Sequence, residues 1–209
     1  MKQHTRRWGL AAAILAVGLQ PAAAHHLMGG RIPATFTEGI LSGLGHPIIG
    51  LDHFAAVVAV GCLAATHRSS VALAIGFVLA MIAGVAAHLH GGTVPAGETL
   101  AAISVVGLGV LLFRHDGISA PAALALFVLV GLIHGYLFGE SIYGAEPTPL
   151  YAYLLGLAAI QSAVALGAMA IAQALMRKSD RISVLRPIGT AIAGVGLTVL
   201  AQQIVPMPA

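Results

Sequence analysis

The residues of this chain that could do chemistry are histidines and carboxylates gathered in short segments. The run HPIIGLDH places an imidazole at His46, and a carboxylate next to an imidazole at Asp52 and His53. A further imidazole, His134, lies in a later apolar stretch. Imidazole and carboxylate ligands without a thiolate suit a borderline divalent ion such as nickel, cobalt or zinc, whereas calcium and magnesium prefer oxygen ligands alone. These residue types predict a site for a divalent transition-metal ion.

Other ligand-type residues lie near the same ends of their segments and extend this predicted metal site. Glu98 and Glu140 would line its entrance, and two pairs of histidines complete the set, namely His25, His26, His88 and His90. Simpler roles stay open for these two pairs, because residues at chain ends and in loops are often plain surface. Gln161, a polar residue in an apolar run, would either face a pathway or bridge helices.

The elements that must position these side chains follow from the composition. Of the 209 residues, 58% are apolar and only 8% are charged, and the mean hydropathy is +0.95. Soluble domains have about 45–50% apolar and about 25% charged residues, so a soluble enzyme is excluded. High hydrophobicity excludes disorder, and long unbroken apolar runs do not fit the short alternating segments of a membrane β-barrel. The composition predicts an all-α, polytopic membrane bundle.

Six apolar runs have the length of a membrane span. They cover residues 47–66, 70–89, 97–113, 120–139, 149–176 and 187–205. We therefore expect a six-helix transmembrane domain over residues 47–209, preceded by a His- and Gly-rich lead-in over residues 25–46. Within this lead-in, residues 37–45 would form a helical turn that caps or re-enters the bundle.

The first 24 residues have the composition of a cleavable signal peptide. Basic residues precede a short apolar stretch, and three alanines at 22–24 provide a cleavage signal. Cleavage would leave the mature N terminus, at His25, outside the cytoplasm. An uncleaved N-terminal helix is the alternative.

Basic residues in the loops give an independent prediction of orientation. Six lie after the first, third and fifth runs, whereas the opposite side has only Arg31; the six are Arg68, Arg114, Arg177, Lys178, Arg181 and Arg186. The positive-inside rule places the six in the cytoplasm, which predicts an inner (plasma) membrane protein. Without residues 1–24 the formal charge falls from +3 to zero, so no nucleic-acid partner is expected. The single cysteine, Cys62, excludes an internal disulfide or CxxC motif.

Counting along the expected helices brings the main ligands to one depth. Pro47 suits the first turn of a helix, which would put His46 at its mouth and His53 on the same face two turns further in. His53 would then lie roughly 8–9 Å below the outer edge, and His134 roughly 8 Å below the outer end of its own helix. Stripes of small residues would let the helices approach closely; they are Gly76, Ala80 and Gly84, continued by His88, and Gly131, Gly135 and Gly139.

Four stretches resemble the HupE/UreJ family of nickel/cobalt permeases. They are GHPIIGLDHFAAVVAVGCLAA at 45–65, HHLMGG from residue 25, PAGE at 95–98 and HGYLFGESIYGAEPTP at 134–149. The resemblance implies a six-span permease or facilitator that takes up Ni²⁺ or Co²⁺ as the transported ion, with no prosthetic group. It also implies metal roles for His46, Asp52 and His53, and for His134 and Glu140.

Two other classes of function stay open at this point. An intramembrane metal hydrolase would use similar ligands to activate water, although no HExxH motif is present. A bis-histidine haem protein would need two facing histidines with room for a porphyrin. No Walker motif is present, so ATP hydrolysis is not built into the chain. The choice between nickel and cobalt, the energy source and a homo-oligomeric state also stay open.

Overall fold

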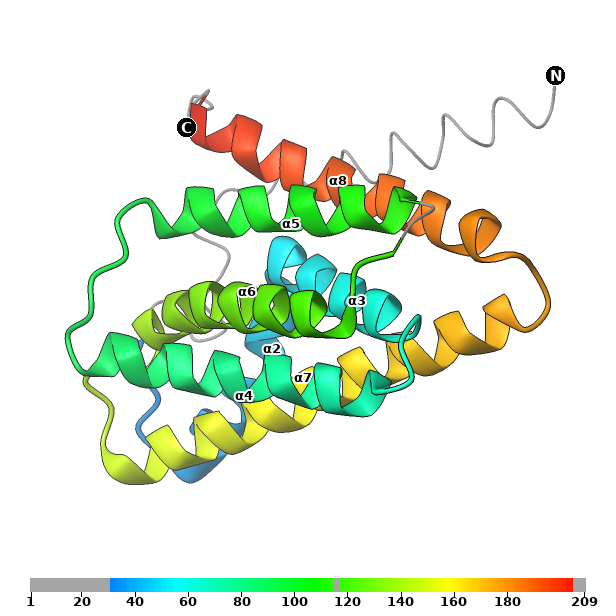
Figure 1. The fold of residues 1–209 in the computed structure, drawn as a ribbon. Helices are drawn as coiled ribbons and strands as arrows, with labels where there is room; N and C mark the ends of the chain where they lie inside the picture. The colour runs from blue at the N-terminus through cyan, green and yellow to red at the C-terminus, as the bar shows by residue number, and fades with distance from the viewer. Residues whose placement is uncertain (1–30, 115–116, 205–209) are drawn as a thin grey trace, which may run out of the picture.

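The computed structural model describes residues 31–114 and 117–204. Within these ranges the regular elements are helices, as Figure 1 shows. In chain order they are α2 (Phe36–Ile49), α3 (Leu51–Ala64), α4 (Ser70–Leu89), α5 (Gly97–Phe113), α6 (Ala120–Glu140), α7 (Pro147–Met176) and α8 (Arg181–Ile204). The prediction of an all-helical fold is confirmed. The expected signal peptide over 1–24, with His25 and His26, lies outside the described residues.

Several of these helices can cross a membrane. Among the described residues, α4, α6, α7 and α8 are each long and apolar enough to do so, and α2 and α3 pass the same test only as a bent pair. The remaining helix, α5, has 17 residues, a length of about 26 Å. That is slightly shorter than the hydrocarbon core of about 30 Å. The described residues therefore contain four or five helical segments long and apolar enough to cross a membrane, besides the shorter apolar α5, and this composition is that of a multi-pass membrane protein.

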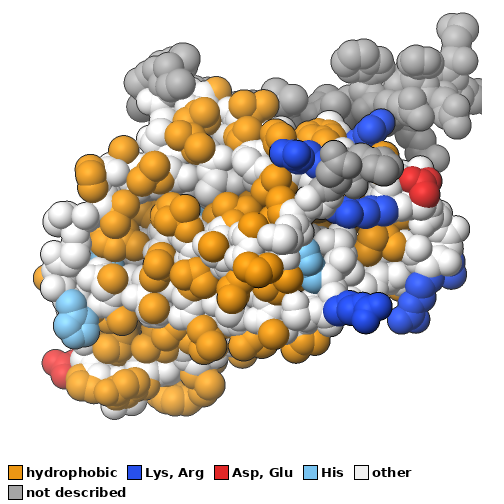
Figure 2. Space-filling view, in the orientation of Figure 1, with side chains coloured by type: hydrophobic (Ala, Val, Ile, Leu, Met, Phe, Trp, Pro, Cys, Tyr) orange, Lys and Arg blue, Asp and Glu red, His pale blue; other side chains and the backbone are white. Residues whose placement is uncertain are grey.

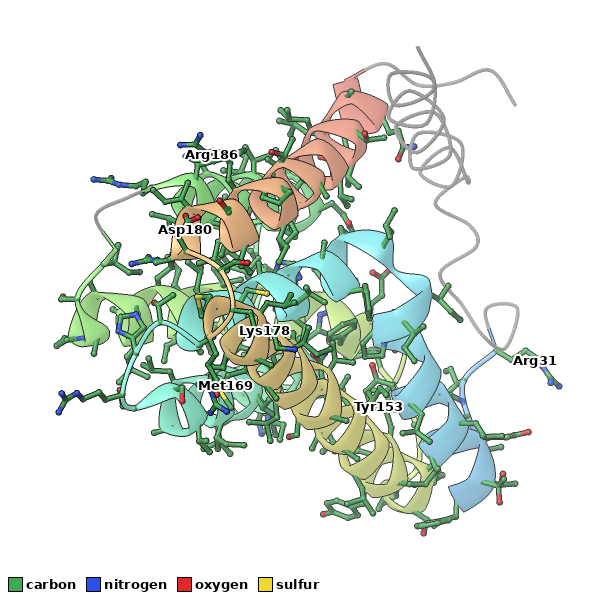
Figure 3. All side chains as sticks on the ribbon, turned by 90° about the vertical axis from the view of Figure 1, so that its right-hand side faces the viewer. Arg31, Tyr153, Met169, Lys178, Asp180 and Arg186 are labelled. Carbon is green, nitrogen blue, oxygen red and sulfur yellow. The ribbon has the colours of Figure 1, made fainter. Side chains whose placement is uncertain are left out.

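The first expected span is not one helix. Between α2 and α3 the chain bends by 80° at a break after Ile49, which Figure 3 shows beside α7. Pro47 lies inside the last turn of α2, and Gly50 ends the helix in an extended conformation (φ −73°, ψ 100°). Proline lacks the N–H that would bond back to the preceding turn. The prediction of one helix over 47–66, with Pro47 in its first turn, was wrong.

Helix α2 also replaces the second half of the expected lead-in. Its 14 residues begin after Thr35, whose hydroxyl accepts a hydrogen bond from the Glu38 N–H while the Glu38 carboxylate accepts one from the Thr35 N–H. This reciprocal capping box fixes the start of the helix. The helical turn expected over 37–45 is thus part of a longer helix that packs along α7.

Helix α3 is the centre of the bundle. It contacts each of the other six described helices, and 11 of its 14 residues are buried. The most extensive contacts among the outer helices join α4 to α6, α2 to α7 and α5 to α8. Figure 1 shows α3 enclosed between these pairs. The residues at the beginning of α3 therefore lie inside the protein, away from lipid.

The small-residue stripes bring α4 and α6 together, as predicted. A side chain at Gly135 would run into the backbone of Met81, and one at Gly84 would meet the carbonyl of Leu132. Gly139 packs against the His88 side chain. The stripes consequently hold His88 against the end of α6. Beside His134, the stripe residue Gly135 contacts Met81 and no histidine.

Charged side chains divide between the two ends of the bundle. Lys and Arg side chains gather toward the right-hand end of Figure 2, where acidic and His side chains also show, and the opposite end shows His and acidic side chains without Lys or Arg. Figure 3 looks onto the basic end, where Lys178, Asp180 and Arg186 are labelled. Asp180 precedes α8 and accepts hydrogen bonds from the Ser183 hydroxyl and N–H. These bonds hold the pKa of the Asp180 carboxyl below its usual value, so this acid serves as a helix cap.

Candidate metal site

The centre of the candidate site is a pair of buried histidines from two helices. His53 in the first turn of α3 and His134 in α6 face each other, and 2.7 Å separates their Nδ1 atoms. Their ring centroids are 4.9 Å apart and the ring planes are nearly perpendicular, at 79°. His134 has no exposed surface and His53 is 7% exposed. The prediction that these two residues lie at one depth is confirmed.

A serine from a third helix completes the contacts of His134. The Ser104 hydroxyl, in the middle of α5, lies 2.9 Å from His134 Nε2. The same hydroxyl donates a hydrogen bond of 2.7 Å to the carbonyl of Ala101. Sequence reasoning missed Ser104, because a single serine in an apolar helix is typical of simple helix packing.

Phe138 joins the third histidine to this pair. Its ring centroid lies 4.4 Å from that of His53 and 5.2 Å from that of His46. The Phe138 carbonyl accepts a hydrogen bond of 3.0 Å from the buried Tyr153 hydroxyl on α7. His46 is in the last turn of α2 and His53 in the first turn of α3. The expectation that they share one helix face two turns apart was wrong, and Phe138 brings them together across the break.

Asp52 lies beside the histidine pair in the first turn of α3. Its carboxylate is 4% exposed and close enough to His134 to interact with it electrostatically. A negative charge is favourable there, because the N-terminal end of a helix carries a partial positive charge. Gly50, two residues before Asp52, leaves room for the imidazole ring of His53, because a Cβ atom at position 50 would lie 2.7 Å from His53 Cδ2.

The arrangement is a nitrogen pair and not a closed metal cage. Within the described residues, no group of three or more His, Cys, Asp or Glu side chains is placed so that it could hold a metal ion. The 2.7 Å between the Nδ1 atoms is a hydrogen-bond distance. Two nitrogens bound to one ion, each at about 2.0–2.1 Å and at right angles, would be about 2.9 Å apart. For both nitrogens to bind one ion, the shared proton would have to leave and the rings would have to separate slightly and rotate until both lone pairs point at the ion.

The remaining predicted ligands do not join this pair. Glu98 is exposed in the first turn of α5, and Glu140 is exposed at the last residue of α6. His88 is half-buried, with its ring centroid 4.6 Å from that of Tyr136, and His90 is exposed with its Nδ1 2.8 Å from the Ala86 carbonyl. The expected entrance residues thus lie at the ends of the helices, separate from the buried histidines.

Two other polar residues noted in the sequence are buried deeper in the bundle. Gln161 on α7 is 1% exposed, and neither its Nε2 nor its Oε1 has a hydrogen-bond partner in the described structure. Cys62 on α3 is a buried free thiol packed in the apolar core. Leaving a buried amide without partners costs about 1–3 kcal/mol, so Gln161 calls for a functional explanation and Cys62 does not.

Comparison with known proteins identifies a family for this chain. The profile of the family described as HupE / UreJ protein matches residues 12–199. A relative named Protein HupE, from Rhizobium leguminosarum bv. viciae, is 36% identical over 104 residues. That alignment covers 49% of this chain and 54% of the relative, about half the length of each. No solved structure matches the chain. Because the profile covers most of the sequence, the chain belongs to the HupE/UreJ family, which is associated with nickel and cobalt transport.

Proposed function

We propose that this chain imports a divalent transition-metal ion, nickel or cobalt, through the inner membrane as a permease or facilitator. The observation that carries the proposal is the buried pair of His53 and His134, whose Nδ1 atoms face each other at 2.7 Å in the middle of the bundle. Ionisable groups at membrane depth are costly, and they typically mark ion pathways. The ion is the cargo here, so a site that holds it loosely suits release on the other side.

The distribution of charge supports a direction of transport. The end with Glu98, Glu140, His88 and His90 would face outward and collect the cation, and His25 and His26 would add two imidazoles to this set of ligands. The basic end would face the cytoplasm. From the mouth the ion would pass His46 and Asp52, reach the histidine pair and leave inward.

The broken helix supports the same proposal through its two ends. Broken helices place backbone groups at membrane depth, which is tolerated where they line a cavity or are buried in protein. The C-terminal end of α2 carries a partial negative charge that favours a cation. The N-terminal end of α3 would repel one, and the buried carboxylate of Asp52 offsets that repulsion.

Transport by purified protein in liposomes tests the function directly. We expect saturable uptake of labelled Ni²⁺ or Co²⁺ that an excess of the other ion inhibits, because imidazole ligands accept both. Protein-free liposomes of the same lipid provide the control. Uptake of neither ion above that control, at any imposed membrane potential or pH gradient, would contradict the proposal.

The two alternative functions would give different results in the same preparation. A bis-histidine haem protein would show a Soret band, but 2.7 Å between the Nδ1 atoms leaves no space for a porphyrin between the imidazoles. A hydrolase would hold a resident ion with about three protein ligands and an open position, whereas the facing pair supplies two nitrogens. Such an enzyme would cleave substrate without moving labelled metal into the liposomes.

Gln161 provides a prediction about the inner part of this route. It lies eight residues, or about 12 Å, beyond Tyr153 along α7, whereas His134 lies about 6 Å inward of Phe138 along α6. The hydrogen bond between Tyr153 and Phe138 sets these two residues at the same level. Counted from that level, Gln161 lies further inward than His134, and it is the next buried polar group on the inner side of the histidine pair. We expect Gln161→Met to lower the uptake rate several-fold while the thermal unfolding temperature stays constant or rises, because the substitution removes an unsatisfied amide.

A second glutamine on the same helix serves as the matched control. The Gln173 amide donates a hydrogen bond of 3.3 Å to the Ser70 hydroxyl near the inner end of α7. Gln173→Met should lower the unfolding temperature slightly and leave uptake per folded molecule unchanged. If Gln161→Met takes up metal at the rate of the wild type, Gln161 is not on the transport route.

A further inference from the structure

The Ser104 hydroxyl has a single proton, and the geometry fixes where that proton goes. A serine hydroxyl donates one hydrogen bond and accepts others. Ser104 Oγ lies 2.7 Å from the Ala101 carbonyl oxygen, which can only accept. The hydroxyl proton must therefore point at that carbonyl, since two oxygens at this distance without a proton between them would repel each other. This leaves the lone pairs of Ser104 for its other neighbour, His134.

The position of the hydroxyl proton determines the tautomer of His134. Its Nε2 lies 2.9 Å from Ser104 Oγ, so Nε2 carries the proton and donates to the serine. A neutral imidazole has one N–H, which leaves the Nδ1 atom of His134 with a free lone pair. That atom faces His53 Nδ1 at 2.7 Å, so His53 is the donor in the bond between the two rings.

We infer that Ser104 is a positioning residue that holds His134 in the tautomer whose Nδ1 can bind the transported metal ion. The inference rests on the proposed function for its consequence in transport, but the tautomer itself follows from the hydrogen bonds alone. Histidines that bind metals nearly always donate their other ring N–H to an oxygen, and removing such a partner costs about 10–100-fold in metal affinity or activity. In this chain three helices, α3, α5 and α6, supply the three members of the arrangement.

Two measurements on Ser104→Ala test the inference. In ¹⁵N-histidine-labelled protein without metal, the resonance that disappears in His134→Gln is assigned to His134, and its nitrogen shifts report which ring atom is protonated. We expect the Nε2–H tautomer in the wild type and a substantial Nδ1–H population in Ser104→Ala. In liposomes the KM for Ni²⁺ or Co²⁺ should rise on the order of 10-fold, with a smaller change in kcat.

A conservative variant and a control separate positioning from simple packing. Ser104→Thr keeps the hydroxyl, and threonine in a helix can make the same bond to a preceding carbonyl, so it should restore both the tautomer and the KM. The control is Thr198→Ala on α8, which removes a hydroxyl that donates a hydrogen bond of 2.9 Å to the Gly194 carbonyl. This control should leave both measurements unchanged.

The outcomes distinguish this inference from the proposed function. A His134 tautomer that is the same in wild type and Ser104→Ala would overturn the inference, even if the wild type transports nickel. If the tautomer shifts in Ser104→Ala but the wild type moves no metal, the positioning role of Ser104 is supported and the transport function is wrong. If Ser104→Ala does not fold, Ser104→Cys replaces it, because a thiol is a weak donor and acceptor and should produce the same shift.

Discussion

Replacing His53 with alanine is expected to abolish the uptake of nickel and cobalt while the protein still inserts into the membrane. The substitution removes one of two facing nitrogens at the centre of the bundle. Because loss of a residue that merely supports a ligand costs about 10–100-fold, loss of a ligand itself should lower uptake by more than about 100-fold. It also leaves the fully buried His134 Nδ1 without its partner, at a cost to stability of about 1–3 kcal/mol.

The measurement is accumulation of labelled Ni²⁺ and Co²⁺ in cells that express equal amounts of membrane-inserted protein. His134→Ala should give the same loss, since the pair acts as a unit. The matched control is His67→Ala, which removes a histidine from the loop between α3 and α4 at the basic end. Unchanged accumulation in the His53→Ala variant would show that the histidine pair is not on the transport route.

The depth of His134 could be predicted from the sequence because its count starts from a well-marked helix end, whereas the count for His53 started from Pro47, which lies in the last turn of α2 and not at the start of a helix. His134 lies six residues before the end of α6, a distance of about 9 Å. The charged loops that mark these ends depend only on composition and order along the chain. Helix type, the multi-pass class and the depth of His134 therefore required no knowledge of tertiary contacts, whereas the contact of His53 with His134 depends on the break before α3.

The break at Gly50 could not be predicted in the same way, because local sequence permits two structures. Pro47 fits the first turn of a helix as well as the last turn of one that ends there. The choice is made by tertiary packing, since side chains at Gly39 and Gly43 would run into the carbonyls of Pro149 and Tyr153 on α7. These close contacts hold α2 against α7 as a helix of its own. The capping box at Thr35 and Glu38 is the one local signal of its start.

Ser104 illustrates a second limit of local reasoning. Its role depends on α5 turning this residue toward α6, and neighbouring residues in an apolar helix do not encode that rotation. The outer acids and histidines illustrate the converse, because their residue types suit a metal while the fold leaves them at the helix ends. Residue type predicts a metal-binding chemistry, and tertiary packing decides which of these residues lie together.

Replacing Gly135 with valine is expected to prevent stable assembly of α4 on α6. A Cβ atom at this position would lie 2.7 Å from both Cα and the carbonyl carbon of Met81. These are backbone atoms, so the two helices would have to separate, and overpacking of this kind typically costs about 1–3 kcal/mol and occasionally more. The shift would also move the adjacent His134 away from His53. We expect little monodisperse protein after extraction, and no metal uptake by the fraction that folds.

A glycine elsewhere in the membrane region shows whether the effect comes from close packing or from glycine itself. Gly107 on α5 has open space around the position of a Cβ atom. Gly107→Ala should therefore keep or raise the unfolding temperature, since alanine is favoured over glycine in a helix by about 1 kcal/mol. Gly135→Ala should lower the unfolding temperature in the same assay, because even one methyl group meets the Met81 backbone. Equal unfolding temperatures for Gly135→Ala and the wild type would mean that the two helices are not held in contact at this point. The position of His134 would then have to be set by α3 and α5 alone.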